Sequence, residues 1–521
     1  MSHSAGTPAT AMPDVGRTVT VGGRDWVPWV VALAASAAYS VISIMYYLRL
    51  DPGSYDLAIF TEYVKQYAHL HAPIVDVKAP GFDLLGDHFH PIVALIGPFW
   101  LFAASPVTLL VAQALLMALS VIPVSRAAAE LLGRTASRWI AVAYAFSWGL
   151  QTMAWFDFHE LAFAVPLLAL SLSALVRGRI RAAVLWAMPL VFVKEDQGFT
   201  VAVIGLLLLG SAWTTRRRAR QAATVQDAGS GEEQSRPAGL SGRWWPGLFL
   251  VVWGIGCSVI TIELIIPHFN PAHIYYYWGE GGVVGGNNQG WSALPGQLVH
   301  GYPGKLETLV QLLLPVAFLA LRSPVGLIAV PNLALRYVNT NSNYWGPWFH
   351  YNAPLMPILF IAAIDALRRL REAEAVAAVR PRYRRLVAGT IRYAPAAMVA
   401  IAVALAFRFP LNQLWNPRQY TTTPVIRAEK TAIGKVPAGT TVEASTAVAA
   451  SLAARDDTFL LDTPDDPAPR YIVFDDTANP WAPTRANAPR YIRRLHPKAS
   501  YQQIYLADGV YVFRRSGPGP S

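Results

Sequence analysis

The sequence predicts a polytopic α-helical membrane protein with about eleven transmembrane helices, followed by a small extracytoplasmic α/β domain. Of its 521 residues, 54% are hydrophobic and only 14% are charged, whereas globular proteins carry about 25% charge. Apolar runs long enough to cross a bilayer recur up to residue 409. Beyond that residue the composition becomes water-soluble, with short strand-like segments separated by helix-like ones.

The apolar runs define the predicted membrane domain, residues 27–409. The polar residues 1–26 have no apolar core typical of a signal peptide, so we assign them to a cytoplasmic tail. Two runs, 91–104 and 182–193, are too short to be assigned by length. The longer predicted spans lie near residues 27–48, 106–124, 136–155, 160–176, 197–213, 244–266, 306–321, 324–338, 352–369 and 393–409.

Arginine-rich loops decide which short run crosses, because such loops prefer the cytoplasm. The four loops are 125–138, 176–181, 214–220 and 368–385. All four are cytoplasmic only if 182–193 crosses and 91–104 does not. We therefore expect eleven spans, an outer carboxyl terminus, and a helix at 91–104 lying on or dipping into the outer leaflet. The net charge of +11 is then a topology signal rather than a sign of nucleic-acid binding.

This topology fixes the remaining segments. The first outer loop is 49–105 and another is 267–305. Residues 214–243 form a cytoplasmic loop, which we predict to be disordered because its centre is rich in Gly, Ser, Glu and Gln. The outer domain, 410–521, contains no glycine-rich phosphate loop or nucleotide-binding fingerprint.

Polar clusters gather on the predicted outer face, and Asp56 is the first. It follows the first span in SYDLAIF. A carboxylate that is partly desolvated beside the membrane suits a general base. Asp is equally common where a helix begins, so a capping role is the alternative.

Two histidine-containing clusters follow on the same face. LLGDHFHP contributes Asp87, His88 and His90, and WFDFHE contributes Asp157, His159 and Glu160. Carboxylate and imidazole groups could bind a divalent cation such as Mg²⁺ or Mn²⁺, with Asp87 and His88 as the first candidates. No recognised metal spacing is present, and a network that orders the loop is the alternative.

The cationic candidates lie at the outer ends of two spans. Lys194, Glu195 and Asp196 follow the short run 182–193, where charges usually line a cavity or pair with one another. Lys194 and Arg336 could hold an anionic headgroup, although Arg336 could also merely snorkel. His350 and Tyr351 lie in an aromatic loop, and YYYW (275–278) could stack on sugar rings or belong to the interfacial aromatic belt.

These residues also carry a resemblance to a family of bacterial membrane proteins called domain of unknown function 2079. The matching stretches are YDLAIF (55–60), LGDHFHP (85–91), WFDFHE (155–160), VKED (193–196), HYNAPLMP (350–357) and, in the outer domain, YIVFDD (471–476). The chain differs at Glu160, where the family commonly has Pro. It also has SLAAR (451–455) in place of an HLSNR-like phrase, so no role of that phrase is carried over.

That family is similar to the GT-C superfamily of glycosyltransferases, which use polyprenyl-phosphate sugars. The resemblance implies a GT-C-like fold in a bacterial plasma membrane and a role for Asp56 as the base that deprotonates an acceptor hydroxyl. The expected partners are the lipid-linked sugar donor and an extracytoplasmic glycan, lipid or protein acceptor, with no nucleic acid. The expected reaction inverts the configuration at the anomeric carbon of the transferred sugar.

Two other classes of function remain open from the sequence. A transporter or flippase for a lipid-linked or small polar substrate would use the same charges for translocation, but it needs polar groups reachable from both faces. A non-catalytic scaffold would present the outer domain to cell-wall partners, and Asp56 would then be dispensable.

Overall fold

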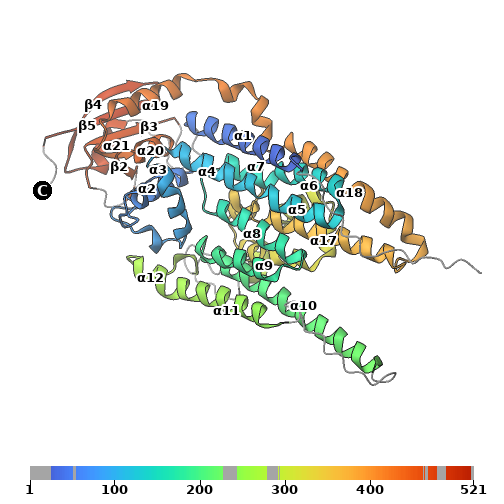
Figure 1. The fold of residues 1–521 in the computed structure, drawn as a ribbon. Coiled ribbons are helices and arrows are strands. Elements are labelled where there is room, and N and C mark those ends of the chain that lie inside the picture. Colours follow the sequence, from blue (N-terminus) through green and yellow to red (C-terminus); the bar gives the residue numbers. More distant parts are fainter. Residues whose placement is uncertain are drawn as a thin grey trace, which may run out of the picture.

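The computed structural model describes residues 25–50, 54–226, 243–278, 292, 294–461, 463, 467–477 and 488–517. Helices account for most of the chain up to residue 409, and a five-stranded sheet lies beyond it (Figure 1). The α-helices of the membrane part are α1 (Val27–Leu48), α2 (Asp56–Ala68), α3 (Gly97–Trp100), α4 (Pro106–Leu119), α5 (Val121–Leu132), α6 (Arg134–Ala145), α7 (Trp148–Trp155), α8 (Leu161–Val176), α9 (Ile180–Ala187), α10 (Gln197–Gln226), α11 (Trp245–Ile260), α12 (Ile266–Phe269), α13 (Leu294–Val299), α14 (Tyr302–Leu313), α15 (Val330–Tyr337), α16 (Ser342–Trp345), α17 (Leu355–Ala375) and α18 (Arg384–Ala406).

Every predicted span is largely helical, although several helices are broken. Five stretches of the described chain are long and apolar enough to cross a bilayer: Val27–Leu48, Pro106–Leu132, Gln197–Gln221, Trp245–Phe269 and Pro381–Ala406. The spans predicted at 306–321 and 324–338 consist of short α-helices joined to 3₁₀ turns, with left-handed backbone at Ala317 and Phe318 between them. The count of eleven spans stays a prediction.

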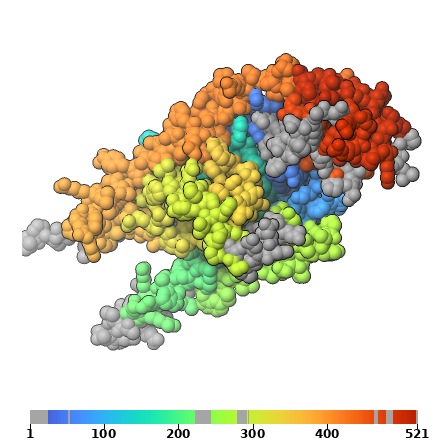
Figure 2. All heavy atoms as spheres, turned by 180° about the vertical axis from the view of Figure 1, so that it is seen from behind, coloured from blue at the N-terminus to red at the C-terminus, as the bar shows by residue number. Residues whose placement is uncertain are grey.

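Ion pairs bring several basic loops to one end of the helical bundle. Glu130, near the end of α5, accepts from Arg177 at 2.8 Å and from Arg179 at 3.1 Å, both in the α8–α9 turn. Asp25, just before α1, pairs with Arg138 of α6 at 3.1 Å. The far ends of α10 and α17 also point away from the sheet domain (Figures 1 and 2). The grouping of basic segments predicted from charge is therefore present in the fold.

The two ambiguous short runs differ in their place in the fold, and which of them crosses the membrane stays a prediction. Residues 180–192 form α9 and the 3₁₀ helix η3 (Met188–Phe192), which lead from the Arg179–Glu130 pair to Lys194 at the opposite end. Residues 91–100 form only η2 (Pro91–Ile96) and α3, and α3 packs against α2 in the first loop, where Gly97 approaches the backbone of Ala68. The segment 91–104 thus lies at the same end of the helical bundle as the first loop.

Small residues explain the close hairpin of α10 and α11. Gly198 and Gly205 of α10 face Gly254 and Gly247 of α11, so a Cβ on Gly198 would lie 2.3 Å from the Gly254 carbonyl oxygen. Close backbone approach of this kind replaces the hydrophobic effect as the source of helix packing in lipid.

The helix α10 continues to Gln226, so the disorder predicted for 214–226 is wrong. Good helix formers such as Arg, Ala and Gln extend the apolar helix past the bilayer. Residues 227–242 of that predicted loop lie outside the described residues.

The predicted outer α/β domain is present as a five-stranded mixed sheet. Its strands are β1 (Thr441–Ala444), β2 (Asp457–Leu460), β3 (Tyr471–Asp475), β4 (Ser500–Ala507) and β5 (Val510–Ser516), in the order β2-β1-β3-β5-β4. Strand β1 pairs in parallel with β2 and β3, whereas β5 pairs antiparallel with both β3 and β4. Helices α19 (Pro424–Lys435), α20 (Thr446–Ala453) and α21 (Ala488–Leu495) flank the sheet.

The α/β domain docks directly on α2, the helix that begins with Asp56. Lys65 of α2 donates from Nζ to the carbonyl oxygens of Ala453, at 2.9 Å, and Asp456, at 2.8 Å, at the end of α20. The hydroxyl groups of Tyr47 and Ser451 lie 2.9 Å apart across the same interface. The domain therefore holds the first outer loop against the bundle (Figure 1).

Candidate functional site

A charged cavity of about 90 Å³ lies at the end of the bundle that carries the α/β domain. Six of the charged, histidine and tyrosine residues that the sequence motifs singled out line it: His88, Lys194, Glu195, Asp196, Arg336 and Tyr351, and two tyrosines of the predicted aromatic strip, Tyr275 and Tyr277, join them. Other lining residues include Asn332 and Tyr344. Segments that are far apart in the chain thus bring both predicted cations, Lys194 and Arg336, and two of the predicted carboxylates, Glu195 and Asp196, to one place.

Gly86 explains why the LLGDHFHP segment lies at this cavity. A Cβ on Gly86 would lie 2.6 Å from the backbone of Phe269, so only glycine permits this approach of α12. Asn270 then donates from Nδ2 to the Gly86 carbonyl oxygen at 2.8 Å. In the residues that follow, His88 faces Glu195, just after η3, and Asp87 faces Lys78 and Tyr277.

Lys194 is the buried cation on one side of the cavity. Its Nζ lies 3.1 Å from Glu160 Oε1, and only 13% of its side chain is exposed. Burial alone would lower the pKa of Lys194, but the carboxylates of Glu160 and Glu195 outweigh it and raise that pKa above its usual value. Lys194 is therefore a permanent positive charge, and Glu160 is part of its support rather than of the lining.

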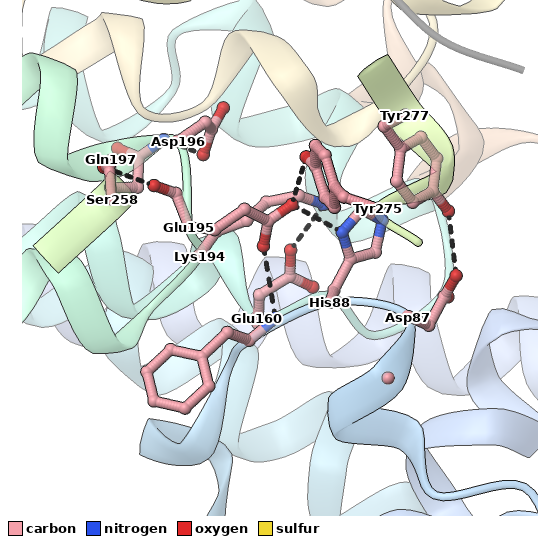
Figure 3. A network of polar contacts seen from close by, with 12 residues as sticks. Asp87, His88, Glu160, Lys194, Glu195, Asp196, Gln197, Ser258, Tyr275 and Tyr277 are labelled. Atoms are coloured by element: carbon pink, nitrogen blue, oxygen red, sulfur yellow. Dashed lines mark hydrogen bonds and ion pairs between the residues drawn. The ribbon is translucent and has the colours of Figure 1, made fainter. Parts of the chain in front are cut away.

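Two linked pairs form the opposite side (Figure 3). Glu195 contacts His88 Nδ1 at 2.7 Å and accepts from the Tyr275 hydroxyl at 2.9 Å. Asp87 accepts from Lys78 Nζ at 2.9 Å and from the Tyr277 hydroxyl at 3.2 Å. The Tyr277 ring stacks on His88 with the ring centres 4.3 Å apart.

Both carboxylates are ionised in this network. Burial opposes ionisation, but the charge of His88, followed by that of Lys78, lowers the pKa of Asp87 to about 2. The charge and hydrogen bond of His88 and the charge of Lys194 likewise lower the pKa of Glu195 to about 2. The network therefore holds fixed charges of both signs at neutral pH.

Arg336 is buried rather than snorkelling, with 4% of its surface exposed. Its guanidinium donates to the carbonyl oxygens of Tyr344 and Tyr351 and to the side-chain oxygens of Asn332 and Asn352, at 2.6 to 3.2 Å. All four acceptors are neutral. Hydrogen bonds thus hold the Arg336 guanidinium in place without neutralising its positive charge. Such a cation suits an anionic ligand.

Asp56 does not line the cavity but lies close to Asp157. It is the first residue of α2, and none of the hydrogen bonds among the described residues involves its side-chain oxygens, so a capping role for the carboxylate has no support. Burial, and then the neighbouring charge of Asp56, raise the pKa of Asp157 to about 7. A carboxyl group whose pKa is raised by burial beside a second carboxylate is typical of acid–base sites.

The remaining predicted histidines form a buried cluster behind the cavity. The rings of His159 and His350 stack with their centres 3.4 Å apart, and His159 Nδ1 lies 2.6 Å from Glu160 Oε2. His90 packs against Phe60 and Tyr63, and burial lowers its pKa to about 4. These residues support Glu160 and Lys194 and do not reach the cavity lining.

The residues present do not form a metal site. Among the described residues, no group of three or more His, Cys, Asp or Glu side chains is arranged to hold a metal ion. The oxygens of Asp87 already accept from Lys78 and Tyr277, while His88 Nδ1 faces Glu195. The suggested Asp87–His88 cation pair is therefore directed at protein donors and acceptors.

Sequence reasoning missed Lys78, Asn332 and Tyr344. Lys78 sits in a turn of the first outer loop without a recognisable motif, and only folding brings it to Asp87. Asn332 is separated from Arg336 by one helical turn, a spacing that could have indicated their contact. Tyr344 lies in the aromatic loop that also contains His350 and Tyr351, but the sequence did not single it out.

Comparison with known proteins identifies relatives of the whole chain. The family described as "Predicted membrane protein (DUF2079)" matches residues 46–512. No curated protein matches the sequence. Among solved structures, ArnT from Cupriavidus metallidurans in the apo state gives a TM-score of 0.50 at 14% identity, over 93% of this chain and 97% of ArnT.

Two further structures are similar over most of the chain. ArnT from Cupriavidus metallidurans bound to undecaprenyl phosphate gives a TM-score of 0.48 at 14% identity, over 94% of this chain and 98% of ArnT. The apo oligosaccharyltransferase of Archaeoglobus fulgidus gives 0.35 at 14% identity, over 87% of this chain and 70% of that enzyme. Both proteins belong to the GT-C superfamily. At these identities the likeness to apo ArnT concerns the fold alone.

Proposed function

This chain belongs to the DUF2079 family of predicted membrane proteins, and from that premise we propose that it is an inverting membrane glycosyltransferase. In this proposal it transfers a sugar from a polyprenyl-phosphate donor to an extracytoplasmic glycan, lipid or protein. The observation that carries the proposal is that Asp56 interacts electrostatically with Tyr344 and Tyr351, which line a cavity with two fixed cations, Lys194 and Arg336. The GT-C-like fold supports it at the level of the superfamily.

The division of charges matches what the reaction requires. A sugar phosphate already has a good leaving group, so the enzyme must deprotonate the acceptor and neutralise the departing phosphate. Asp56 takes the proton of the acceptor hydroxyl, and the acceptor oxygen bonds to the anomeric carbon from the side opposite the phosphate. The bond between that carbon and the phosphate oxygen breaks, and its electron pair stays on the phosphate beside Lys194 and Arg336.

The size of the cavity fits the phosphate rather than the whole donor. Ligand pockets usually have volumes of about 300–1,000 Å³, and this cavity measures about 90 Å³. Tyr275 and Tyr277 cover its charged side through their bonds to Glu195 and Asp87. We expect these two tyrosines to separate from the carboxylates when the sugar enters.

ArnT of Cupriavidus metallidurans has been crystallised with undecaprenyl phosphate, which is the class of carrier proposed for this donor. The first experiment asks whether the gently extracted protein carries a polyprenyl phosphate, with or without one sugar, in native mass spectrometry. We expect such adducts in the wild type. Only ordinary phospholipids, even after a panel of lipid-linked sugars is added, would favour a transporter instead.

The phosphate position is tested with Lys194→Met. Removing this ammonium leaves Glu160 buried without its cation, which could disturb folding, so the double variant Lys194→Met, Glu160→Gln serves as the matched control. We expect both proteins to lose the adduct. Retention of the adduct in a folded double variant would contradict phosphate binding by Lys194.

The base is tested with Asp56→Asn, which is nearly isosteric and removes the basicity of the carboxylate. Loss of a general base typically lowers the rate about 10²–10⁴-fold. Transfer of radiolabelled sugar from the donor found by mass spectrometry provides the readout. Asp83→Asn is the control, because Asp83 lies in the same outer loop and its capping oxygen, which accepts from Leu85, is retained in asparagine. Full activity in Asp56→Asn would exclude the assignment.

A further inference from the structure

A second cavity, of about 310 Å³, lies in the α/β domain. It is bounded by α21, the turn after it and the first residues of β4, and its lining includes Arg493, His496, Ser500, Tyr501 and Phe513. Its volume is within the usual range of ligand pockets. Its walls combine a cation, an imidazole, a hydroxyl group and an aromatic ring.

This cavity faces away from the membrane domain. Side chains alternate between the two faces of a strand, and Val442 and Ala444 of β1 belong to the core that continues into the bundle. On the other face, Ile472 and Phe474 of β3 pack with α21 in a separate small core. Because α20, which contacts α2, lies on the first face and α21 on the second, the cavity opens on the side remote from the helical bundle.

A buried acidic group supports the floor of this cavity. Glu443, in the middle of the sheet, is fully buried, and its Oε2 lies 2.5 Å from His496 Nε2. Burying such a pair costs more free energy than a well-packed apolar pair would, so packing alone does not account for it. The carboxylate fixes the ring orientation of His496 at the cavity wall.

The segment that supplies the cavity lining, residues 488–517, is strongly basic. Between residues 488 and 517 there are six cations and one carboxylate: Arg490, Arg493, Arg494, Lys498, Arg514 and Arg515, against Asp508. Arg515 pairs in register with Tyr501, which lines the cavity. Its Nε is buried without a hydrogen-bond partner among the described residues. Arg493 is the cation in the lining itself, and the excess of positive charge along this segment favours an anionic ligand.

We propose that this pocket binds an anionic sugar unit of the acceptor, with Arg493 and His496 holding its carboxylate or phosphoryl group and Tyr501 packing on its ring. That this sugar belongs to the acceptor rests on the proposed glycosyltransferase function, whereas the binding of an acidic sugar is independent of it. A membrane-lipid headgroup is disfavoured as the ligand because the pocket lies on the face of the sheet remote from the bundle.

The test is saturation-transfer NMR with the full-length protein in nanodiscs of zwitterionic lipid. The probes are D-glucuronate, D-glucose as its neutral counterpart, and inorganic phosphate as a competitor. We expect saturation transfer to glucuronate but not to glucose, and we expect phosphate to compete with glucuronate. Glucuronate should bind Arg493→Gln at least about tenfold more weakly. Because Arg493 is exposed, its loss spares the fold. Lys430→Gln removes an exposed cation of the same domain from α19, on the other face of the sheet, and should bind as the wild type does.

Several results would overturn the proposal. These are no transfer to glucuronate, equal weakening by Lys430→Gln and Arg493→Gln, or no effect of Arg493→Gln. Binding of phosphatidylglycerol vesicles that depends on Arg493, without binding of glucuronate, would show a lipid surface instead. Asp56→Asn should bind glucuronate normally, so a failure of the transferase proposal and a failure of this pocket give different results.

Discussion

At the scale of single residues, the carboxyl pair Asp56 and Asp157 determines how the site should respond to pH. Asp157 has a pKa of about 7, raised by burial and by the charge of Asp56. Below that pH it is neutral and only Asp56 contributes a negative charge. Above it, Asp157 adds a second negative charge beside Asp56, and this added charge disfavours binding of an anionic phosphate.

We therefore expect the affinity for the polyprenyl-phosphate donor to fall several-fold as the pH rises through about 7. In Asp157→Asn this side chain is neutral at every pH, so the fall in donor affinity with rising pH should disappear in that variant. Donor titrations followed by native mass spectrometry or tryptophan fluorescence between about pH 6 and 8 would measure it. A step that persists unchanged in Asp157→Asn would assign the titration to another group.

Sequence reasoning reached much of the site at this scale but could not assign the roles. Short motifs named Lys194, Glu195 and His88, which do line the cavity. The same motifs named Asp87 and His88 as a possible cation site, which their partners Lys78, Tyr277 and Glu195 oppose. The reason is that side-chain direction and the identity of the nearest charge depend on contacts between distant segments.

At the scale of elements, α2 links the outer domain to the proposed base. Asp56 begins this helix, while Glu62 anchors its middle and Lys65 its last turn. Glu62 accepts from the Val77 amide at 3.1 Å, and burial raises its pKa to about 8, so its carboxyl is mostly neutral at pH 7. Lys65 joins the helix to the end of α20 by two hydrogen bonds, where a cation also interacts favourably with the helix dipole.

Lys65→Met should therefore loosen the docking of the α/β domain without unfolding either part. Hydrogen bonds to charged groups contribute about 1.5–3 kcal/mol, which corresponds to about tenfold or more in the opening equilibrium. Hydrogen–deuterium exchange of α20 should accelerate accordingly, and proposed transfer activity should fall because α2 loses its support. Lys65→Arg keeps a cation and should recover most of the protection; equal exchange in all three proteins would refute the coupling.

At the scale of the whole molecule, the topology separates a basic end from an end that carries the site. The Glu130 and Asp25 ion pairs gather the basic turns, and the α/β domain occupies the opposite end (Figure 1). Which end faces the cytoplasm follows from the positive-inside rule. That orientation remains a prediction from charge.

Cysteine labelling tests the orientation directly. Leu84 would be a poor probe in the first outer loop because it is buried, whereas Leu70 is 94% exposed. In a Cys257→Ser background, Leu70→Cys should react with a membrane-impermeant maleimide on intact cells. Arg218→Cys, exposed on α10 at the basic end, should react only after permeabilisation. The reverse pattern would invert the topology.

The sequence by itself determined the membrane class, the helical runs and the existence of a carboxyl-terminal α/β domain. These properties follow from local composition and periodicity, which are readable wherever burial or lipid contact requires apolar residues. The tertiary structure alone decided which charges meet: Lys78 with Asp87, Lys194 with Glu160, and Glu443 with His496. Such pairs join residues distant in the chain, and their pKa values depend on burial and on the nearest opposite charge, which no local pattern encodes.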